Sequence, residues 1–576
     1  MSRTRNYLSF SRHALSRGGF QRGRSSFAGF VFASAFLALA VRAAWVQCVN
    51  DDFYQRQGEI RQVSDRDTHA SRGRILDRDG RPLAMDIPTR TVWLDAIAAG
   101  APASASQIDA LAHILGIAPV TIEHAYASHR QFVYLRRQIS TAMAERAMRV
   151  DAPGVFAQKD YRRFYPESEV AANVVGFTGI DGKGQEGMER SADHLLHGVD
   201  GWKRTLHNAR GQAIANLAQQ PARNGADVRL SLDLPVQYAA CQALRDAVTR
   251  VNARSGSAIV LDAHTGEILA MANWPSFNPN SRTRRSGLAM RNRAVTDVFE
   301  PGSVMKPVTI ALALQEGRIT PDSVVTTGGG RLRLDGATIH DDDDFGTLTV
   351  AGVIQKSSNV GTTKIALMMP AADMWRNFHQ VGLGKAPHAG LPGEAAGNLR
   401  AWEHWRRIEQ ATMSYGYGLS ASLLQLAQAY TAFANDGVFV PATIHDLLAP
   451  PRGHRVYSAR TARQIRAMME KVVSAGGTAP QAAVQGYTVA GKTGTAYRWV
   501  HGGYDRSQYR ASFVGIIPAR RPRVVIAVSI DRPRRGSHFG GAVAGPAFVD
   551  IATQTMQLLN VSPDKPFTPP APAPTT

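Results

Sequence analysis

A serine and a lysine stand at a spacing that suits nucleophilic chemistry. Ser303 and Lys306 form an S-x-x-K motif just before a run of apolar helix formers. Because a proline is tolerated only in the first turn of a helix, Pro307 places both side chains at or near a helix N-terminus, where residues three apart share a face. A serine attacks only when a base takes its proton, and a lysine can be that base when burial and the positive end of a helix lower its pKa. The pair is therefore a candidate nucleophile and base.

The S-x-x-K motif alone is weak evidence for a catalytic site, because a second S-x-x-K occurs in the Pro-rich tail at Ser562 and Lys565. Other catalytic motifs in the chain would strengthen it. Ser357 and Asn359 supply the first partner, an S-x-N. The serine hydroxyl can relay a proton between the base and a leaving group, and the asparagine amide can hydrogen-bond a substrate amide or the lysine. Another S-x-N, which starts at Ser276, precedes the nucleophile beside a Trp-Pro pair and predicts a turn.

The second partner is the only K-[ST]-G in the chain, which continues a stretch rich in β-strand formers. Its glycine, Gly494, removes side-chain bulk and would let a substrate peptide add to the strand edge. The positive charge of Lys492 and the hydroxyls of Thr493 and Thr495 could receive a terminal carboxylate. The N–H groups of Thr495 and Ser303 could together form an oxyanion hole. Alone, the stretch is equally typical of an ordinary glycine-containing edge strand.

The elements around these motifs predict an α+β fold. Strand patterns lie at both ends of the region from residue 226 to 560, and its middle is mostly helical, which favours one antiparallel sheet with helices packed on it. The expected strands are 228–232, 257–262, 267–272, 512–517 and 523–531, and the expected flanking helices are 233–248 and 546–559.

The N-terminal part of the chain predicts a membrane anchor. Residues 1–26 are basic without a single acid, and residues 27–46 are apolar except for Ser34 and Arg42. This length spans a bilayer if Arg42 lies near the end, and the basic flank predicts a cytoplasmic N-terminus. A cleaved signal peptide is the alternative, but the apolar run continues past its small residues, so we favour an uncleaved anchor.

The sequence pattern of residues 50–225 differs from that of the segments on either side. It predicts a β-rich pedestal or partner-binding domain. Residues 71–84 predict two short strands around an Asp-Gly turn, and 103–115 and 121–127 predict helices. The region has no nucleophile and base pair, so we interpret its Arg, Asp and Glu residues as structural ion pairs. Residues 561–576, rich in Pro and Thr, predict a disordered tail.

Composition and charge exclude some classes of protein. The chain has 576 residues, 44% hydrophobic and 19% charged, which is ordinary for a folded protein of several domains. Its net charge of +20 suits nucleic acid or an anionic membrane, but no nucleic-acid-binding motif accompanies it. The two cysteines, Cys48 and Cys241, exclude a disulfide framework.

Two charged runs carry weaker signals. The acidic run 341–344 favours a solvated loop over a metal site. Arg506, Arg510 and the basic run 532–535 follow the K-T-G motif. For these residues a solvated face is favoured over a role in holding an acidic glycan peptide.

The order S-x-x-K, S-x-N, K-T-G is far more specific than any one motif. Together with its flanks it resembles class B penicillin-binding proteins, and most fully the division-specific FtsI family, over about residues 27–555. The matching segments are 72–78, 300–307, 356–361, 414–420 and 491–495.

The resemblance implies a D,D-transpeptidase for peptidoglycan that needs no metal or other cofactor. Ser303 would attack the D-Ala-D-Ala amide of one stem peptide, release D-alanine and pass the acyl group to an amine of a neighbouring stem. Lys306 would be the base, Ser357 and Asn359 would assist, and Lys492, Thr493 and Thr495 would hold the donor carboxylate; β-lactams would acylate the serine. Implied partners are an FtsW-type glycosyltransferase and other divisome proteins, with the catalytic domain in the periplasm.

Other functions stay open at this point. A β-lactamase would need a group that activates water, and Glu394 and Asn398 have a suitable spacing, although their flanks look more like the transpeptidase pattern. A D,D-carboxypeptidase, an elongation-specific transpeptidase, a non-catalytic divisome scaffold and a penicillin-sensing receptor are the further alternatives.

Overall fold

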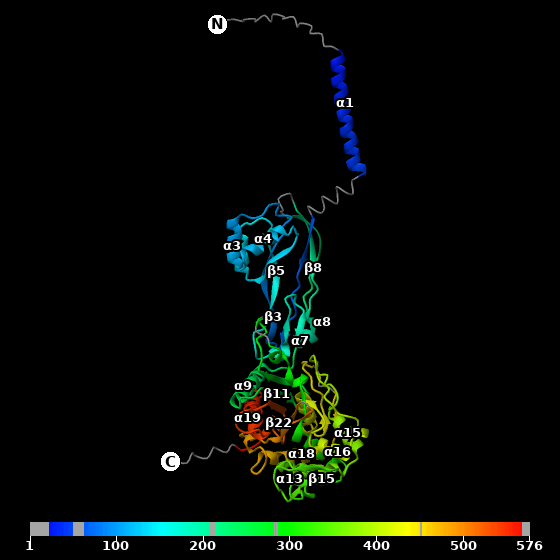
Figure 1. Cartoon of the computed structure of the whole chain (residues 1–576), viewed down its shortest axis with the longest axis vertical. Coiled ribbons are helices and arrows are strands. Elements are labelled where there is room, and N and C mark those ends of the chain that lie inside the picture. Colours follow the sequence, from blue (N-terminus) through cyan, green and yellow to red (C-terminus); the bar gives the residue numbers. More distant parts are fainter. Residues whose placement is uncertain are drawn as a thin grey trace, which may run out of the picture. The chain divides into compact units, whose positions relative to one another are not determined.

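The computed structural model describes residues 22–49, 63–207, 213–281, 283, 286–447, 449, 452–500 and 502–566 (Figure 1). Most of the basic segment 1–26 therefore lies outside the described residues. The chain divides into two compact units, one formed by residues 1–68 and 200–222 and the other by the remainder.

The first unit contains one apolar helix and a small sheet. Helix α1, Arg22–Ala44, continues into the π-helical turn η1, Trp45–Val49, and the stretch Gly23–Val49 is long and apolar enough to cross a membrane. Strands β1 (Val63–Thr68), β8 (Gly201–His207) and β9 (Ala213–Gln220) form an antiparallel sheet in the order β1-β8-β9. The expectation of one N-terminal apolar helix is confirmed.

The second unit begins with the rest of the pedestal, whose sheet is built on one long strand. Strand β3, Pro82–Leu94, pairs from Met85 to Leu94 with the whole of β5, Val155–Phe164, and helices pack beside this pair (Figure 1). As predicted, the short strand β2, Ile75–Leu76, meets β3 across an Asp-Gly turn. The other elements here are β4 (Val133–Ile139), α3 (Ala105–Leu115), α4 (Pro119–Ala127) and α5 (Thr141–Met148).

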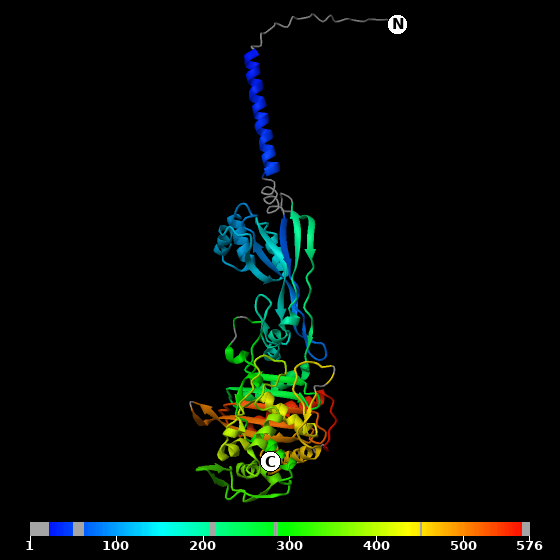
Figure 2. The same ribbon diagram turned by 90° about the vertical axis from the view of Figure 1, so that its right-hand side faces the viewer.

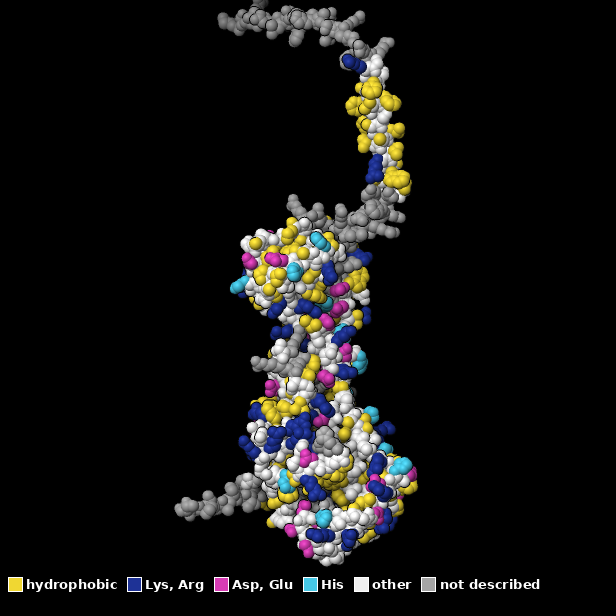
Figure 3. Space-filling view, in the orientation of Figure 1, with side chains coloured by type: hydrophobic (Ala, Val, Ile, Leu, Met, Phe, Trp, Pro, Cys, Tyr) yellow, Lys and Arg dark blue, Asp and Glu magenta, His cyan; other side chains and the backbone are white. Residues whose placement is uncertain are grey.

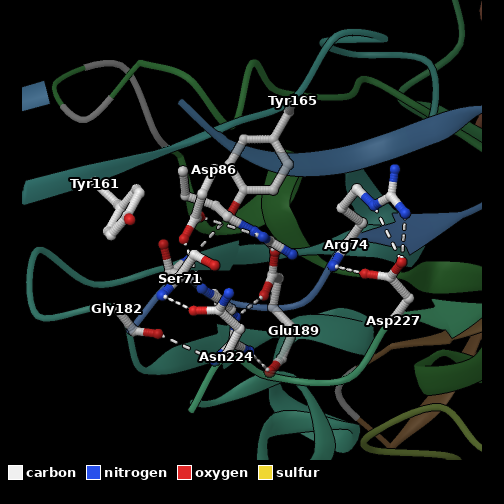
Figure 4. Close-up of polar contacts among 12 residues, drawn as sticks. Ser71, Arg74, Asp86, Tyr161, Tyr165, Gly182, Glu189, Asn224 and Asp227 are labelled. Carbon is white, nitrogen blue, oxygen red and sulfur yellow. Dashed lines mark hydrogen bonds and ion pairs between the residues drawn. The ribbon is translucent and has the colours of Figure 1, made fainter. Parts of the chain in front are cut away.

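Buried ion pairs join distant segments of the pedestal, which confirms the structural interpretation of its charges (Figure 4). The two carboxylate oxygens of Glu189 each lie 2.6 Å from an Nε atom, one from Arg72 and one from Arg163. Glu189 is fully buried, and the side chains of both arginines are 5% exposed. Asp86 on β3 extends the cluster, because it accepts from the backbone N–H of Arg72 and pairs with Arg163 at 3.3 Å. Arg74 and Asp227 form a separate pair that is largely open to solvent.

The region from residue 226 to 560 is built on an antiparallel five-stranded sheet in the order β12-β11-β23-β22-β21. Strands from the start and the end of the region lie side by side in both views, because β11 pairs with β23 (Figures 1 and 2). The strands are β11 (Ser255–Asp262), β12 (Ile268–Trp274), β21 (Ala490–Val500), β22 (Gly503–Ile517) and β23 (Val524–Asp531). Strand β21, which carries the K-T-G motif, is an edge strand of this sheet.

Helices cover both faces of this sheet, so the α+β prediction is confirmed. Helices α9 (Leu234–Arg250) and α19 (Gly540–Leu558) pack on one another and on the strands, and α17 (Leu423–Ala434) packs on β11 and β23. The helical middle of the region also includes α12 (Lys306–Gln315), α13 (Val350–Lys356), α14 (Asn359–Ala366), α15 (Ala371–Gln380), α16 (Arg407–Ser414) and α18 (Ala459–Glu470).

Two C-terminal expectations differ from the structure. The last helix starts at Gly540 and not at Pro546, which lies inside it. Its N-terminus is anchored to the sheet, since the Gly540 N–H donates to Thr495 Oγ1 at 3.0 Å. Part of the segment expected to be disordered packs on the domain: Asp564 accepts from the N–H of Thr488 at 2.7 Å. Residues 567–576 lie outside the described part of the chain.

Candidate active site

The nucleophile candidate lies in a tight turn that leads into a buried helix. Ser303 belongs to the 3₁₀ turn η2, Gly302–Met305, and α12 starts at Lys306, so the sequence places the motif correctly at a helix start. The turn is held from behind, because the Tyr430 hydroxyl donates to the carbonyl of Val304 at 2.8 Å.

The structure brings residues of all three motifs to one hydroxyl. Ser357 Oγ accepts from Lys306 Nζ at 3.1 Å and from Lys492 Nζ at 2.9 Å. Lys306 Nζ also donates to the carbonyl of Ser357, and Lys492 Nζ donates to Thr493 Oγ1 at 3.2 Å. Three motifs that lie far apart in sequence thus form one chain of hydrogen bonds, through Lys306, Ser357 and Lys492.

Both lysines are buried, and burial is the main cause of their altered acidity. Lys306 and Lys492 are each 0% exposed. Removal from water disfavours an ammonium ion and lowers the pKa of Lys306 to about 7. Burial and the neighbouring Lys306 charge hold the pKa of Lys492 well below its ordinary value. Lys306 is therefore available as a neutral base near neutral pH.

An aspartate of the acidic run positions the S-x-N motif. Asp341 Oδ2 accepts from Ser358 Oγ at 2.6 Å, and its Oδ1 accepts from the Val360 N–H at 2.9 Å. Ser358 is in turn the N-cap of α14, and Ser357 adopts the left-handed conformation with φ 59°. The interpretation of this run as a solvated loop is therefore wrong for Asp341. Its sequence signal, one acid among four, gave no hint of which serine it would bind.

Asn359 has a different partner from the one expected. Its Nδ2 donates to the carbonyl of His340 at 2.8 Å, so in this structure the amide fastens the loop before α14. Within the described part of the chain, no group of three or more His, Cys, Asp and Glu side chains has the arrangement of a metal site.

The K-T-G strand contributes hydroxyls and a close approach to the nucleophile turn. Thr493 Oγ1 lies 3.1 Å from Thr478 Oγ1, and Thr495 accepts from the start of α19. Gly494 has a different role from the one predicted. A Cβ there would lie 2.4 Å from Ser512 Oγ and 2.9 Å from the Pro301 carbonyl oxygen, so the missing side chain makes room for the protein itself and not for a substrate.

The segment 414–420 supports the same turn from the other side. The N–H of Gly302 donates to the Gly416 carbonyl at 3.1 Å, and Glu300 Oε1 accepts from the Gly418 N–H at 2.8 Å. Gly416 has φ +88°, and a Cβ on it would lie 2.2 Å from the Gly302 carbonyl oxygen. Only glycine fits at this contact.

Replacing Gly416 with alanine is expected to slow acylation by penicillin about 10²-fold. The new methyl group must displace the turn that carries Ser303, the candidate nucleophile, and displacements of about 1 Å have effects of this size. The measurement is the second-order rate constant for labelling by a fluorescent penicillin. Gly317→Ala is the control, because a Cβ there meets nothing within 4 Å, although φ is also positive at +69°. Equal rates for the two variants would contradict the steric role of Gly416.

The competing motifs do not join this site. Ser276 follows the cis bond Trp274-Pro275 and donates to the Glu169 carbonyl at 2.8 Å. The predicted turn follows it, since the Ser281 N–H donates to the Asn278 carbonyl at 3.1 Å. The two carboxylate oxygens of Glu394 accept from the N–H groups of Ala389 and Leu391 at 2.9 and 2.8 Å. A carboxylate held within its own loop in this way is poorly placed to activate water, which weakens the β-lactamase alternative.

Known sequence families match both folded regions. Residues 67–230 match the penicillin-binding protein dimerisation domain, and residues 256–553 match the penicillin-binding protein transpeptidase domain. The chain belongs to the penicillin-binding transpeptidase family. Its S-x-x-K, S-x-N and K-T-G motifs all lie within the matched transpeptidase domain.

Individual relatives agree with this assignment. A probable peptidoglycan D,D-transpeptidase PenA of Neisseria meningitidis is 40% identical over 551 residues, which are 95% of this chain and 94% of the relative. The peptidoglycan D,D-transpeptidase FtsI of Escherichia coli K12 is 38% identical and covers 92% of this chain and 91% of its own. The apo transpeptidase domain of Burkholderia pseudomallei penicillin-binding protein 3 is 54% identical with a TM-score of 0.55, and covers 58% of this chain and 98% of its own. This penicillin-binding protein is therefore a peptidoglycan D,D-transpeptidase, with a pedestal followed by the enzymatic domain.

Proposed function

We propose that Ser303 is the nucleophile and that the reaction runs through an ester on its Oγ. The observation that carries this proposal is that the Ser357 hydroxyl accepts from both Lys306 and Lys492. Lys306, the first residue of α12, is three residues along the chain from Ser303. Neutral Lys306 takes the Ser303 proton as Oγ attacks the carbonyl of the penultimate D-alanine. The proton then passes by way of Ser357 to the nitrogen of the terminal D-alanine, which leaves.

The remaining motif residues bind the donor and stabilise charge. Lys492, Thr493 and Thr495 hold the terminal carboxylate, and Asn359 hydrogen-bonds the donor backbone. The N–H groups of Ser303 and Thr495 stabilise the oxyanion of the tetrahedral intermediate. An amine of a second stem then attacks the ester carbonyl and forms the cross-link amide as the bond to Ser303 Oγ breaks. The proton of the amine passes through the Lys306–Ser357 pair to Ser303 Oγ, which is restored as a hydroxyl. β-Lactams acylate Ser303 by the same first step.

The cellular role proposed is cross-linking of the septal wall during division. FtsI of Escherichia coli, 38% identical over 536 residues, supports this role. In this proposal the helix Gly23–Val49 anchors the protein in the inner membrane, with the N-terminus in the cytoplasm and the enzyme in the periplasm. An FtsW-type glycosyltransferase and other divisome proteins contact the anchor and the pedestal.

Mapping the acylated residue tests the chemistry. The full chain in detergent is treated with a penicillin and digested, and each peptide is searched for the added mass. The adduct is expected on the peptide that contains Ser303, while the peptide with the second S-x-x-K, at Ser562, stays unmodified. An adduct elsewhere, or rapid loss of the label from Ser303, would refute a stable acyl-enzyme on that serine.

Depletion in the native organism tests the cellular role separately. Filamentous cells with few septa are expected if the enzyme serves division. Round cells would instead assign it to elongation. A Ser303→Ala chain that restores normal division would show that the protein acts as a scaffold without chemistry.

A further inference from the structure

Arginines from four neighbouring strands lie at one end of the five-stranded sheet. They are Arg498 on β21, Arg510 on β22, Arg532 directly after β23 and Arg254 directly before β11. The strand register aligns them, because Asp531 at the end of β23 pairs with Ser255 of β11 and with Arg510 of β22. On its other side Arg510 pairs with Ala496, two residues before Arg498. Since neighbouring strands lie about 4.8 Å apart, the four arginines cross the end of the sheet over about 15 Å.

Two further arginines extend this row over the surface. Arg534 and Arg535 are exposed, and their backbone N–H groups both donate to the carbonyl of Val251, which directly follows α9. Figure 3 shows Lys and Arg side chains gathered over α9 on the visible face of the domain. We call the six residues the arginine face: Arg254, Arg498, Arg510, Arg532, Arg534 and Arg535. Clustered charge of one sign attracts ligands of the other, so this face favours an anion.

The inner part of the arginine face has a structural carboxylate. Arg498 Nε lies 3.5 Å from Asp531 Oδ1, and Arg510 Nη2 lies 3.2 Å from the same oxygen. The side chain of Arg510 is 16% exposed, and its guanidinium lies over the Phe299 ring, 4.5 Å from the centroid, so the prediction of a solvated face is wrong for this residue. The other four arginines of the face form no ion pair with another described residue. One carboxylate thus leaves the face with an excess of positive charge.

Two donor atoms of the arginine face are enclosed and unpaired. Arg498 Nη1 and Arg532 Nε have no hydrogen-bond partner among the described residues. Arg532 also has φ 53°, in the left-handed region that costs a non-glycine residue free energy and that is common at binding sites. Partial burial, and then the charges of Arg498 and Arg254, lower the pKa of Arg532, so these cations repel one another. A bound anion would relieve both the repulsion and the unpaired donors.

The polymer on which this family acts offers a matching anion. Stem peptides of peptidoglycan carry carboxylates at intervals along the strand, and a guanidinium binds a carboxylate through two parallel hydrogen bonds. A single small anion would occupy one or two guanidinium groups, whereas a row of about 15 Å suits repeated carboxylates. The face begins at Arg498, three residues beyond Thr495, which is about 10 Å along β21. A polymer held there lies outside the catalytic centre but within reach of it.

We propose that the arginine face binds a peptidoglycan strand through the carboxylates of its stem peptides, as a surface separate from the reaction at Ser303. The strand remains on the enzyme through this face while individual stems enter and leave the catalytic centre. Binding at the face requires peptidoglycan but not a nucleophilic Ser303, so the two assignments can fail independently.

Co-sedimentation with insoluble peptidoglycan sacculi tests the proposal on the full chain in detergent. The chain is first treated with a fluorescent penicillin, which occupies the active site, and the protein in the pellet is measured on a stained gel. Native sacculi are compared with sacculi whose carboxyl groups have been converted to amides. Since each exposed ion pair contributes little and several act together, amidation is expected to raise the Kd about tenfold. Added salt should weaken binding to the native sacculi, because it screens exposed charges.

Paired variants locate the surface. Arg534→Gln combined with Arg535→Gln is expected to raise the Kd for native sacculi about fivefold and to leave the rate of penicillin labelling unchanged. Arg520→Gln combined with Arg521→Gln is the matched control, because it also removes two adjacent exposed arginines, at the opposite end of β23. Equal binding by the two double variants, or equal binding of native and amidated sacculi, would overturn the proposal. A wild-type chain that binds sacculi but takes no label at Ser303 would refute the proposed function and leave the arginine face standing.

Discussion

Replacing Lys306 with methionine is expected to lower the rate constant for acylation by penicillin about 10³–10⁴-fold. A positioned base contributes about 10²–10⁴-fold, and Lys306 is the buried amine three residues from Ser303, the proposed nucleophile. Methionine has a similar length and suits a buried site, so folding should be retained. The variant also leaves the Lys492 contact to Ser357 Oγ, 2.9 Å, in place.

The pH dependence distinguishes a base from a merely structural lysine. Burial lowers the pKa of Lys306 to about 7, and only the neutral amine can accept a proton. In the wild-type chain the acylation rate should therefore fall about tenfold for each pH unit below 7 and level off about one unit above it. In Lys306→Met the acylation rate should not show this fall below pH 7.

The matched control is Lys364→Met, which removes an ammonium from α14, where Nζ donates to the Thr326 carbonyl at 2.7 Å. It should keep both the wild-type rate and the wild-type pH profile. A Lys306→Met chain with more than a tenth of the wild-type rate would show that another group takes the proton.

The sequence predicted the members of the site better than their contacts. The motif order, together with its resemblance to a known family, indicated Ser303, Lys306, Ser357 and Lys492, and helix and strand periodicity placed them on suitable elements. That Ser357 Oγ accepts from both lysines depends on the left-handed turn at Ser357, which spacing does not report. The role of Asp341 escaped detection for a similar reason, since one acid in a run of four has no distinguishing local pattern.

Other misses come from tertiary packing that overrides a local rule. Gly494 looked like an opening for a substrate, but the carbonyl of Pro301, nearly two hundred positions earlier in the chain, occupies the space. Pro546 looked like a helix start, but the helix begins six residues earlier, at Gly540. The hydrogen bond from the Gly540 N–H to Thr495 Oγ1 fixes its first turn there.

Replacing Glu189 with glutamine is expected to destabilise the pedestal by about 3–5 kcal/mol. Glu189 is fully buried and is the shared partner of Arg72 and Arg163, whose side chains are 5% exposed (Figure 4). Glutamine keeps the shape but removes the charge that both guanidinium groups face. Arg163 then keeps only Asp86 at 3.3 Å and Arg72 only Asp193 at 2.6 Å, so each buried guanidinium loses one of its two carboxylate partners, and breaking a buried ion pair has a cost of this size.

Hydrogen exchange of the full chain measures this effect locally. Amides of β3, which carries Asp86 of the same cluster, should lose about 10²–10³-fold of their protection, because each 1.4 kcal/mol is a factor of ten. Asp227→Asn is the matched control, since it also removes one carboxylate that pairs with an arginine. Its side chain is 39% exposed and that of Arg74 is 57% exposed, so the expected change is within about 1 kcal/mol.

The same two variants show how the pedestal is coupled to the enzyme. Glu189 lies in the pedestal and far along the chain from Ser303, so the rate of penicillin acylation should stay near that of the wild type while β3 loses protection. Equal protection in Glu189→Gln and Asp227→Asn would mean that the buried cluster adds no more stability than a surface pair. A parallel loss of acylation would mean that the charge cluster also sets the geometry of the catalytic turn.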